Sequence, residues 1–162
     1  MFPQENDDDN LLADLFQVRF NQGNLSGHKL GNIILLGLAQ LAQEKKSDTS
    51  LGLASAQAIA LASRLFRTKG QVLPMSTDDV HLVAEYDGDV RIVGEDKIDD
   101  IKNHPSHRCA KCYHLQPNAS IYEPAEEAIT SSDMIILGPG DIGTSIIANL
   151  VVDGAKEALA SS

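Results

Sequence analysis

The first half of the chain places its apolar residues at helical intervals. They recur every three or four positions, which gathers them on one face of a helix, in segments 9–20, 26–43 and 51–68. In segment 26–43 the apolar stripe is wide enough to predict a mostly buried helix, with Ser26 as its N-cap. Segment 51–68 carries alanine at every second position from Ala54 to Ala62, which allows close packing against a neighbouring helix.

After residue 70 the helical spacing of apolar residues gives way to shorter apolar runs. Runs of strand length are found at 71–73, 80–86, 89–93, 108–115 and 133–137. Asp87-Gly88 separates two of them and predicts a hairpin. Further helices are expected at 95–103, from Pro124 onward and at 154–160. We therefore predict a single α/β domain over residues 1–162, helical first and mixed afterwards.

A glycine-rich corner is the most informative feature of the second half. Residues 137–145 follow the apolar run 134–136 and precede the apolar segment 146–150, as in a strand, loop and helix. The glycines permit a tight turn, and the N–H groups of the helix point back at the loop, which makes an anion site. The loop matches neither standard phosphate-binding fingerprint, so a simple turn remains an equal alternative. Asp141 can cap the helix, but its charge would repel a phosphate unless a cation or ligand hydroxyl lies between them.

A second group of candidate site residues lies at the start of segment 26–43. His28 and Asn32 are four residues apart and share a helix face, with Gly31 between them leaving room for a ligand near the backbone. The two side chains can line a pocket at the glycine-rich corner. The alternative is that His28 fills space and Asn32 satisfies a nearby carbonyl.

The region 104–114 is rich in potential metal ligands, namely His104, His107, Cys109, Cys112 and His114. If residues 108–115 form a strand, Cys109 and Cys112 project to opposite faces, whereas a zinc Cys-x-x-Cys pair sits on a tight turn and needs a second ligand pair. We therefore expect these cysteines to be neither disulfide-bonded nor metal ligands, and we assign no metal site.

Charge and composition narrow the class of protein. The net charge of −10 opposes nucleic-acid binding, which requires basic patches, and favours a small-molecule partner. No apolar run approaches the roughly 18 residues of a membrane span, and the acidic, polar start is unlike a signal peptide. We expect a cytoplasmic protein. No nucleophile, base and orienting group can be named as a set, so no catalytic residue is assigned and binding is the simpler role.

Several motifs in order and spacing resemble the gluconeogenesis factor family, which is related to 2-phospho-L-lactate transferase. They are Leu15-Phe16-Gln17 with Arg19-Phe20, Leu25-Ser26-Gly27-His28 with Leu30-Gly31-Asn32, Val72-Leu73-Pro74, Asp87-Gly88, Gly94-Glu95, Leu137-Gly138-Pro139-Gly140, Thr144-Ser145-Ile146-Ile147 and Asn149-Leu150. The resemblance covers nearly the whole chain.

The resemblance implies a Rossmann-like three-layer α/β fold with a mostly parallel sheet, a helical N-terminal half and an inserted β-hairpin. It also implies a regulator that binds a nucleotide or nucleotide sugar, UDP-N-acetylglucosamine, and acts in carbon metabolism, cell-wall precursor supply and cell shape. The implied ligand-binding residues are Gly138, Pro139, Gly140, Asp141, Thr144, Ser145, Asn149, His28 and Asn32. The alternatives are a phospholactyl-type transferase, which would need magnesium, and a truncated chain that is inactive alone. A protein partner and a homo-oligomer are left open.

The chain also departs from the family pattern. Family members carry a tyrosine where this loop has Gly143 and a proline where it has Ala148. The family's N-terminal glycine-rich strand and loop and its C-terminal strands have no counterpart here, so the chain resembles the middle portion of the family domain. In a doubly wound sheet that first loop contributes to the ligand crevice. We therefore expect a nucleotide sugar to stabilise this chain weakly.

Overall fold

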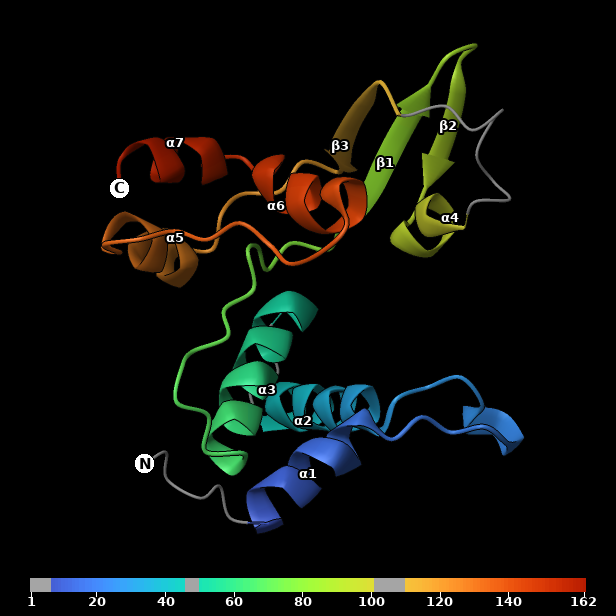
Figure 1. Ribbon diagram of the computed structural model, residues 1–162, viewed down its shortest axis with the longest axis vertical. Coiled ribbons are helices and arrows are strands. Elements are labelled where there is room, and N and C mark those ends of the chain that lie inside the picture. The colour runs from blue at the N-terminus through green and yellow to red at the C-terminus, as the bar shows by residue number, and fades with distance from the viewer. Residues whose placement is uncertain (1–6, 46–49, 101–109) are drawn as a thin grey trace. The chain divides into compact units, whose positions relative to one another are not determined.

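The computed structural model describes residues 7–45, 50–100 and 110–162, with side chains from residue 11 (Figure 1). Within it the chain forms two compact units, Met1–Leu73 and Pro74–Ser162. None of the helices in the described residues is long and apolar enough to cross a membrane.

The first unit is helical, as the periodicity predicts. It contains the helices α1 (Asp7–Gln17), α2 (Leu30–Lys45) and α3 (Leu51–Leu65) and the 3₁₀ turn η1 (Gly23–Leu25). Helices α2 and α3 pack through small side chains, and their shared core consists of Ala39, Ala42, Ala54 and Ala58. The prediction that α2 is mostly buried is wrong, because Leu36 and Leu41 on its outer side are 56% and 53% exposed.

Helix α2 begins four residues later than predicted, at Leu30, so Ser26 is not its N-cap. The backbone of the preceding residues is already paired with the chain that follows α1. The Phe20 N–H donates to the His28 carbonyl at 3.0 Å, and the Leu30 N–H donates to the Val18 carbonyl at 2.8 Å. Residues held in these extended contacts cannot also adopt helical hydrogen bonding, which delays the helix to Leu30.

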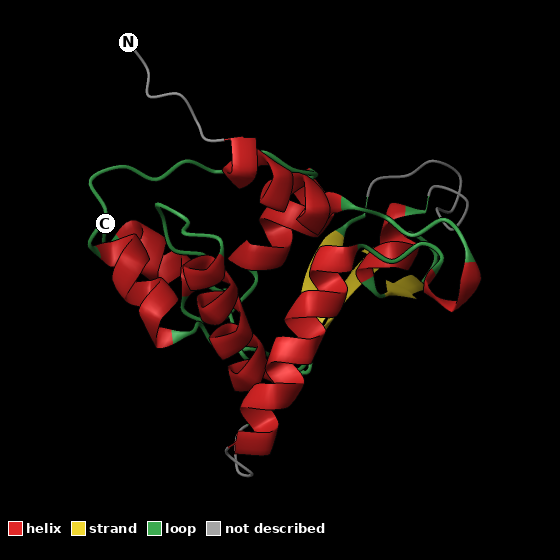
Figure 2. Ribbon diagram, turned by 90° about the horizontal axis from the view of Figure 1, so that it is seen from below, coloured by secondary structure: helices red, strands yellow, loops and turns green. Residues whose placement is uncertain are grey.

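The second unit contains short helices and a small sheet, whose strands are yellow in Figure 2. The strands β1 (His81–Tyr86), β2 (Val90–Val93) and β3 (Cys112–Gln116) form an antiparallel sheet in the order β2-β1-β3. The helices are α4 (Glu95–Asp99), α5 (Glu123–Thr130), α6 (Ala148–Leu150) and α7 (Ala155–Ala160), with a π-helical turn, η4 (Ile142–Ile147), directly before α6. One face of the sheet builds the core of this unit through Leu82, Ala84, Tyr86, Ile92 and Leu115, joined by Ile98, Ala119, Val152 and Ala155.

The hairpin around Asp87-Gly88 is confirmed, with Tyr86 paired to Val90. The prediction of a mostly parallel sheet is wrong for the described residues, whose sheet is antiparallel throughout. Residues 71–73 and 133–137, predicted as strands, form no ladder. In the second of these segments Met134 and Ile136 are 77% and 79% exposed. An apolar run becomes a strand only beside a strand that pairs with it, and among the described residues none lies there.

Candidate functional site

The glycine-rich corner is held together by Asp141, which stands at the N-cap of η4. Its Oδ1 accepts hydrogen bonds from the Gly143 N–H at 2.8 Å, from the Thr144 N–H at 3.2 Å and from the Thr144 hydroxyl at 3.5 Å. The backbone N–H groups of Thr144 and Gly143 favour the ionised carboxylate, which holds the pKa of Asp141 below its ordinary value of 3.8. The capping role predicted for Asp141 is confirmed.

This capping changes what the corner can bind. The next two N–H groups, from Ser145 and Ile146, donate to the Asp141 carbonyl at 3.1 and 3.0 Å. The amides that the sequence assigns to an incoming anion are therefore engaged within the loop, and the carboxylate at the helix start would repel a phosphate. These hydrogen bonds disfavour the expected anion site at these four N–H groups.

Close neighbours leave no room for a side chain at Gly140 or Gly143. A Cβ on Gly140 would lie 2.7 Å from the Cβ of Ser145, and its φ of +153° disfavours a side chain independently. A Cβ on Gly143 would meet the hydroxyl and ring of Tyr113, which projects from β3. The space beside the residue where the family resemblance places a tyrosine is thus filled by a different tyrosine of this chain.

A cavity of about 350 Å³ lies alongside the corner. Four of the predicted site residues line it, namely Gly138, Pro139, Ser145 and Asn149. The other walls are apolar side chains of Met75, Ile129, Ile135, Ile136, Leu137, Ile146, Leu150 and Leu159. The Asn149 amide donates to the Ser145 carbonyl at 2.6 Å, which fixes one of the polar groups at the wall.

The remaining corner residues do not line this cavity. Thr144 is buried, 7% exposed, and lines a second cavity of about 310 Å³ beside Leu82, Gly94 and Leu115. Gly140 and Asp141 lie in the exposed loop that closes the corner. Sequence reasoning missed Met75, Ile129 and Leu159 as cavity residues, since each comes from a different segment and carries no local signal for a site.

His28 and Asn32 belong to the first unit, and both are exposed. Their convergence with the corner of the second unit stays a prediction. Gly31, however, does not leave room for a ligand as predicted, because the side chain of Phe16 occupies that space. A Cβ there would lie 2.6 Å from the ring of Phe16, so this glycine admits the side chain of α1. That ring also contacts Phe66 edge to face at 4.8 Å between centroids.

Comparison with known proteins identifies the family. The family described as 2-phospho-L-lactate transferase CofD matches residues 3–162. The chain belongs to the CofD family. A protein of Thermotoga maritima, provisionally named a gluconeogenesis factor, is 34% identical over 157 residues, which cover 96% of this chain and 45% of that protein. The Gluconeogenesis factor of Halalkalibacterium halodurans is 33% identical over 153 residues, covering 94% and 43% of the two chains.

A crystal structure of a Bacillus halodurans protein has a similar fold. It superposes with a TM-score of 0.77 at 34% identity, over 94% of this chain and 45% of that one. The resemblance found in the motifs is therefore confirmed. The chain spans less than half the length of these CofD-family relatives.

Proposed function

We propose that this chain is part of a nucleotide-sugar-binding regulator of carbon metabolism, cell-wall precursor supply and cell shape, and that it carries out no chemistry itself. The observation that carries the proposal is the cavity beside the glycine-rich corner. Small-molecule sites are concave and mostly apolar, with a few polar groups that orient the ligand. The walls of this cavity are mostly apolar, and Ser145 and Asn149 add polar groups to them. The relatives named gluconeogenesis factor support the regulatory role.

The corner favours the sugar end of such a ligand over its phosphates. The Asp141 carboxylate is ionised and exposed, so it attracts hydroxyl donors and repels phosphate. A nucleotide sugar offers both groups. In the proposed pose its sugar hydroxyls face Asp141, and an apolar part of the ligand enters the cavity near Asn149.

The alternative is a phospholactyl-type transferase that requires magnesium, which the description of the matching family favours. In that case Asp141 would contribute to a magnesium site. Its Oδ1 already accepts three hydrogen bonds from its own loop, and a metal ion would have to compete with them.

Thermal unfolding with UDP-N-acetylglucosamine, UDP, GDP and phosphate, each with and without magnesium, tests the proposal. A ligand at about 100 times its Kd stabilises by about 2.7 kcal/mol, and one below its Kd by a few tenths. We expect a small response of this chain to UDP-N-acetylglucosamine and a larger one in a version extended to the length of its relatives, both without magnesium. A response only to GDP with magnesium would favour the transferase, and no response in either version would contradict nucleotide-sugar binding.

Two substitutions locate the binding. Asn149→Ala removes a polar group from the cavity wall, and the loss of one hydrogen bond is expected to weaken binding about tenfold. Asn118→Ala makes the same change at an exposed position of the same unit and should leave affinity unchanged. If His28 converges with the corner, His28→Ala weakens binding as well. Equal affinities for Asn149→Ala and Asn118→Ala would place the ligand elsewhere.

A further inference from the structure

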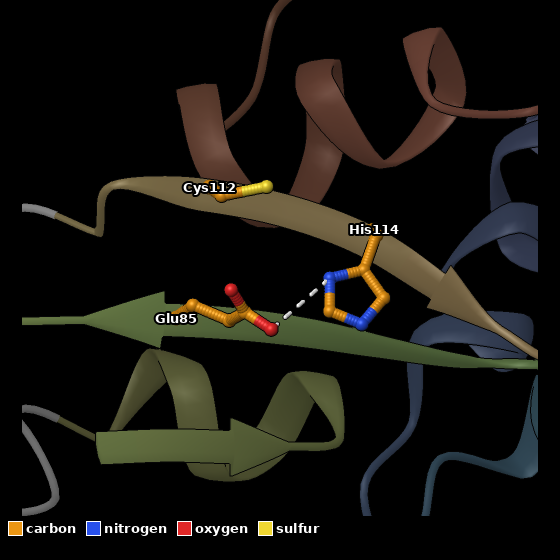
Figure 3. A group of neighbouring side chains, drawn as sticks. All are labelled: Glu85, Cys112 and His114. Atoms are coloured by element: carbon orange, nitrogen blue, oxygen red, sulfur yellow. Dashed lines mark ion pairs between the residues drawn. The ribbon is translucent and has the colours of Figure 1, made fainter. Parts of the chain in front are cut away.

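Three potential metal ligands gather on the face of the sheet opposite the cluster that contains Leu82, Ala84 and Tyr86. Glu85 of β1 is paired with Cys112 of β3, and His114 lies two residues further along β3 (Figure 3). One donor atom from each of the three residues lies within 4.8 Å of the others. The His114 Nδ1 is 3.9 Å from the Glu85 Oε1.

The strand geometry explains why these side chains meet. Residues two apart on a strand project to the same face, so Cys112 and His114 stand side by side. Glu85 lies between the core residues Ala84 and Tyr86 and therefore projects to the opposite face from them. Side chains of directly paired residues in antiparallel strands lie close together, which brings Glu85 to Cys112.

We propose that Glu85, Cys112 and His114 bind a single Zn²⁺ ion, with water completing its coordination. Thiolate, imidazole and carboxylate are the ligands that zinc takes in proteins, and a thiolate selects zinc over magnesium or calcium. Zinc distances of about 2.0 to 2.3 Å place tetrahedral donor atoms roughly 3.3 to 3.6 Å apart. The present separations, up to 4.8 Å, thus require the donors to close by about 1 Å.

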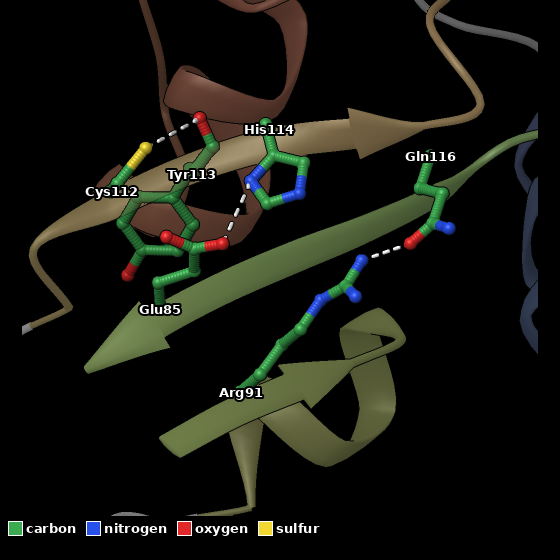
Figure 4. A network of polar contacts seen from close by, with 6 residues as sticks. All are labelled: Glu85, Arg91, Cys112, Tyr113, His114 and Gln116. Carbon is green, nitrogen blue, oxygen red and sulfur yellow. Dashed lines mark hydrogen bonds and ion pairs between the residues drawn. The ribbon is translucent and has the colours of Figure 1, made fainter. Parts of the chain in front are cut away.

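Side-chain rotation can supply that movement. The Glu85 and His114 side chains are 50% and 39% exposed, and Cys112 is exposed, so the packing does not lock them. The Cys112 thiol donates to the Tyr113 carbonyl over a long distance, 3.7 Å (Figure 4). On binding, the thiol proton passes to solvent and the sulfur lone pair forms the bond to zinc.

The neighbouring cations are engaged with other groups. Arg91 lies opposite Glu85 on β2, and its guanidinium donates to the Gln116 side chain (Figure 4). Lys111 pairs with Asp87 at 2.5 Å. Among the described residues, the carboxylate of Glu85 is paired with the imidazole of His114.

The proposal departs from the sequence-based expectation of no metal. That expectation rested on Cys109 and Cys112, which are three positions apart and would project to opposite faces of a strand. The proposed site instead uses Cys112 and His114, which are two residues apart on β3. Its third ligand, Glu85, comes from β1, which is distant in sequence. Cys109 lies outside the described residues.

Zinc titration in competition with a chromogenic chelator tests the site, using the whole chain after metal removal. We expect one zinc per chain. Cys112→Ser, His114→Gln and Glu85→Gln should each weaken binding by more than about tenfold, since even the loss of an outer partner of a metal ligand costs 10- to 100-fold. His81→Gln, at an exposed histidine on the same face of β1, and Cys109→Ser should bind as the parent does.

Cobalt substitution gives a second, spectroscopic readout that does not depend on a measured affinity. The Co²⁺-loaded parent should show thiolate-to-cobalt charge-transfer absorption, retained in Cys109→Ser and lost in Cys112→Ser. Unfolding midpoints without metal should be alike in the parent and in the Glu85, Cys112 and His114 variants, because these side chains are exposed or half-exposed. Absence of this absorption in the parent, or zinc affinity unchanged in Cys112→Ser, would overturn the proposal.

Discussion

Replacing Gly140 by alanine should destabilise the unit Pro74–Ser162 by about 2–6 kcal/mol, the sum of two costs. The first is backbone strain, because its φ of +153° is rarely adopted by residues with a side chain. Strained backbone conformations cost about 1–3 kcal/mol each. The second is steric overlap with the Ser145 Cβ, 2.7 Å from the added methyl group. Overpacking typically costs a further 1–3 kcal/mol.

Gly138 provides a matched control in the same loop. Its φ is +106°, so alanine is strained there too, but the nearest atoms to its added Cβ would lie 4.0 Å away. Gly138→Ala therefore carries only the backbone cost. The difference between Gly140→Ala and Gly138→Ala measures the overlap, which we expect to be about 1–3 kcal/mol.

Tyrosine fluorescence during urea unfolding is the appropriate assay. The chain has no tryptophan, and its three tyrosines, Tyr86, Tyr113 and Tyr122, all belong to the unit Pro74–Ser162. The signal consequently reports on the unit that contains the loop. Ser145→Gly supplies a rescue, because it removes the Cβ that the new methyl group would meet.

A double-mutant cycle tests whether the close approach to Ser145 is the reason for glycine at position 140. Gly140→Ala combined with Ser145→Gly should recover at least about 1 kcal/mol relative to the sum of the single changes. If Gly138→Ala costs as much as Gly140→Ala, or if the cycle shows no coupling, the close approach to Ser145 does not explain this glycine.

Two further predictions concern the same unit. Asp141→Asn should remove part of the acid sensitivity of the unfolding midpoint. The folded-state pKa of Asp141 is lowered, so its stabilisation is present above the unfolded pKa and is lost as pH falls through the folded pKa. Midpoints of wild type and Asp141→Asn measured from neutral pH to below 3.8 should converge at the acid end, and a constant gap would contradict the capping argument. Ile136→Thr should cost less than about 0.5 kcal/mol, as surface changes do, whereas Ile92→Ala in the core should cost about 2–5 kcal/mol. Similar losses at both positions in urea unfolding would show that residues 133–137 are buried.

The features that local sequence predicts best are those whose cause is local. The helical period of the first half, the hairpin at Asp87-Gly88 and the cap formed by Asp141 each depend on residues within a few positions of one another. The motifs also establish the CofD family, because motif order and spacing are properties of the chain itself.

The tertiary structure decided what depends on distant neighbours. Residues 133–137 have the composition of a buried strand but no pairing partner among the described residues. Gly31 adjoins the ring of Phe16, a contact that no spacing within α2 reveals. Likewise Glu85 approaches Cys112 and His114 only through the pairing of β1 with β3. Periodicity records which face of an element a residue occupies, whereas the identity of the neighbour on that face depends on how separate segments pair and pack.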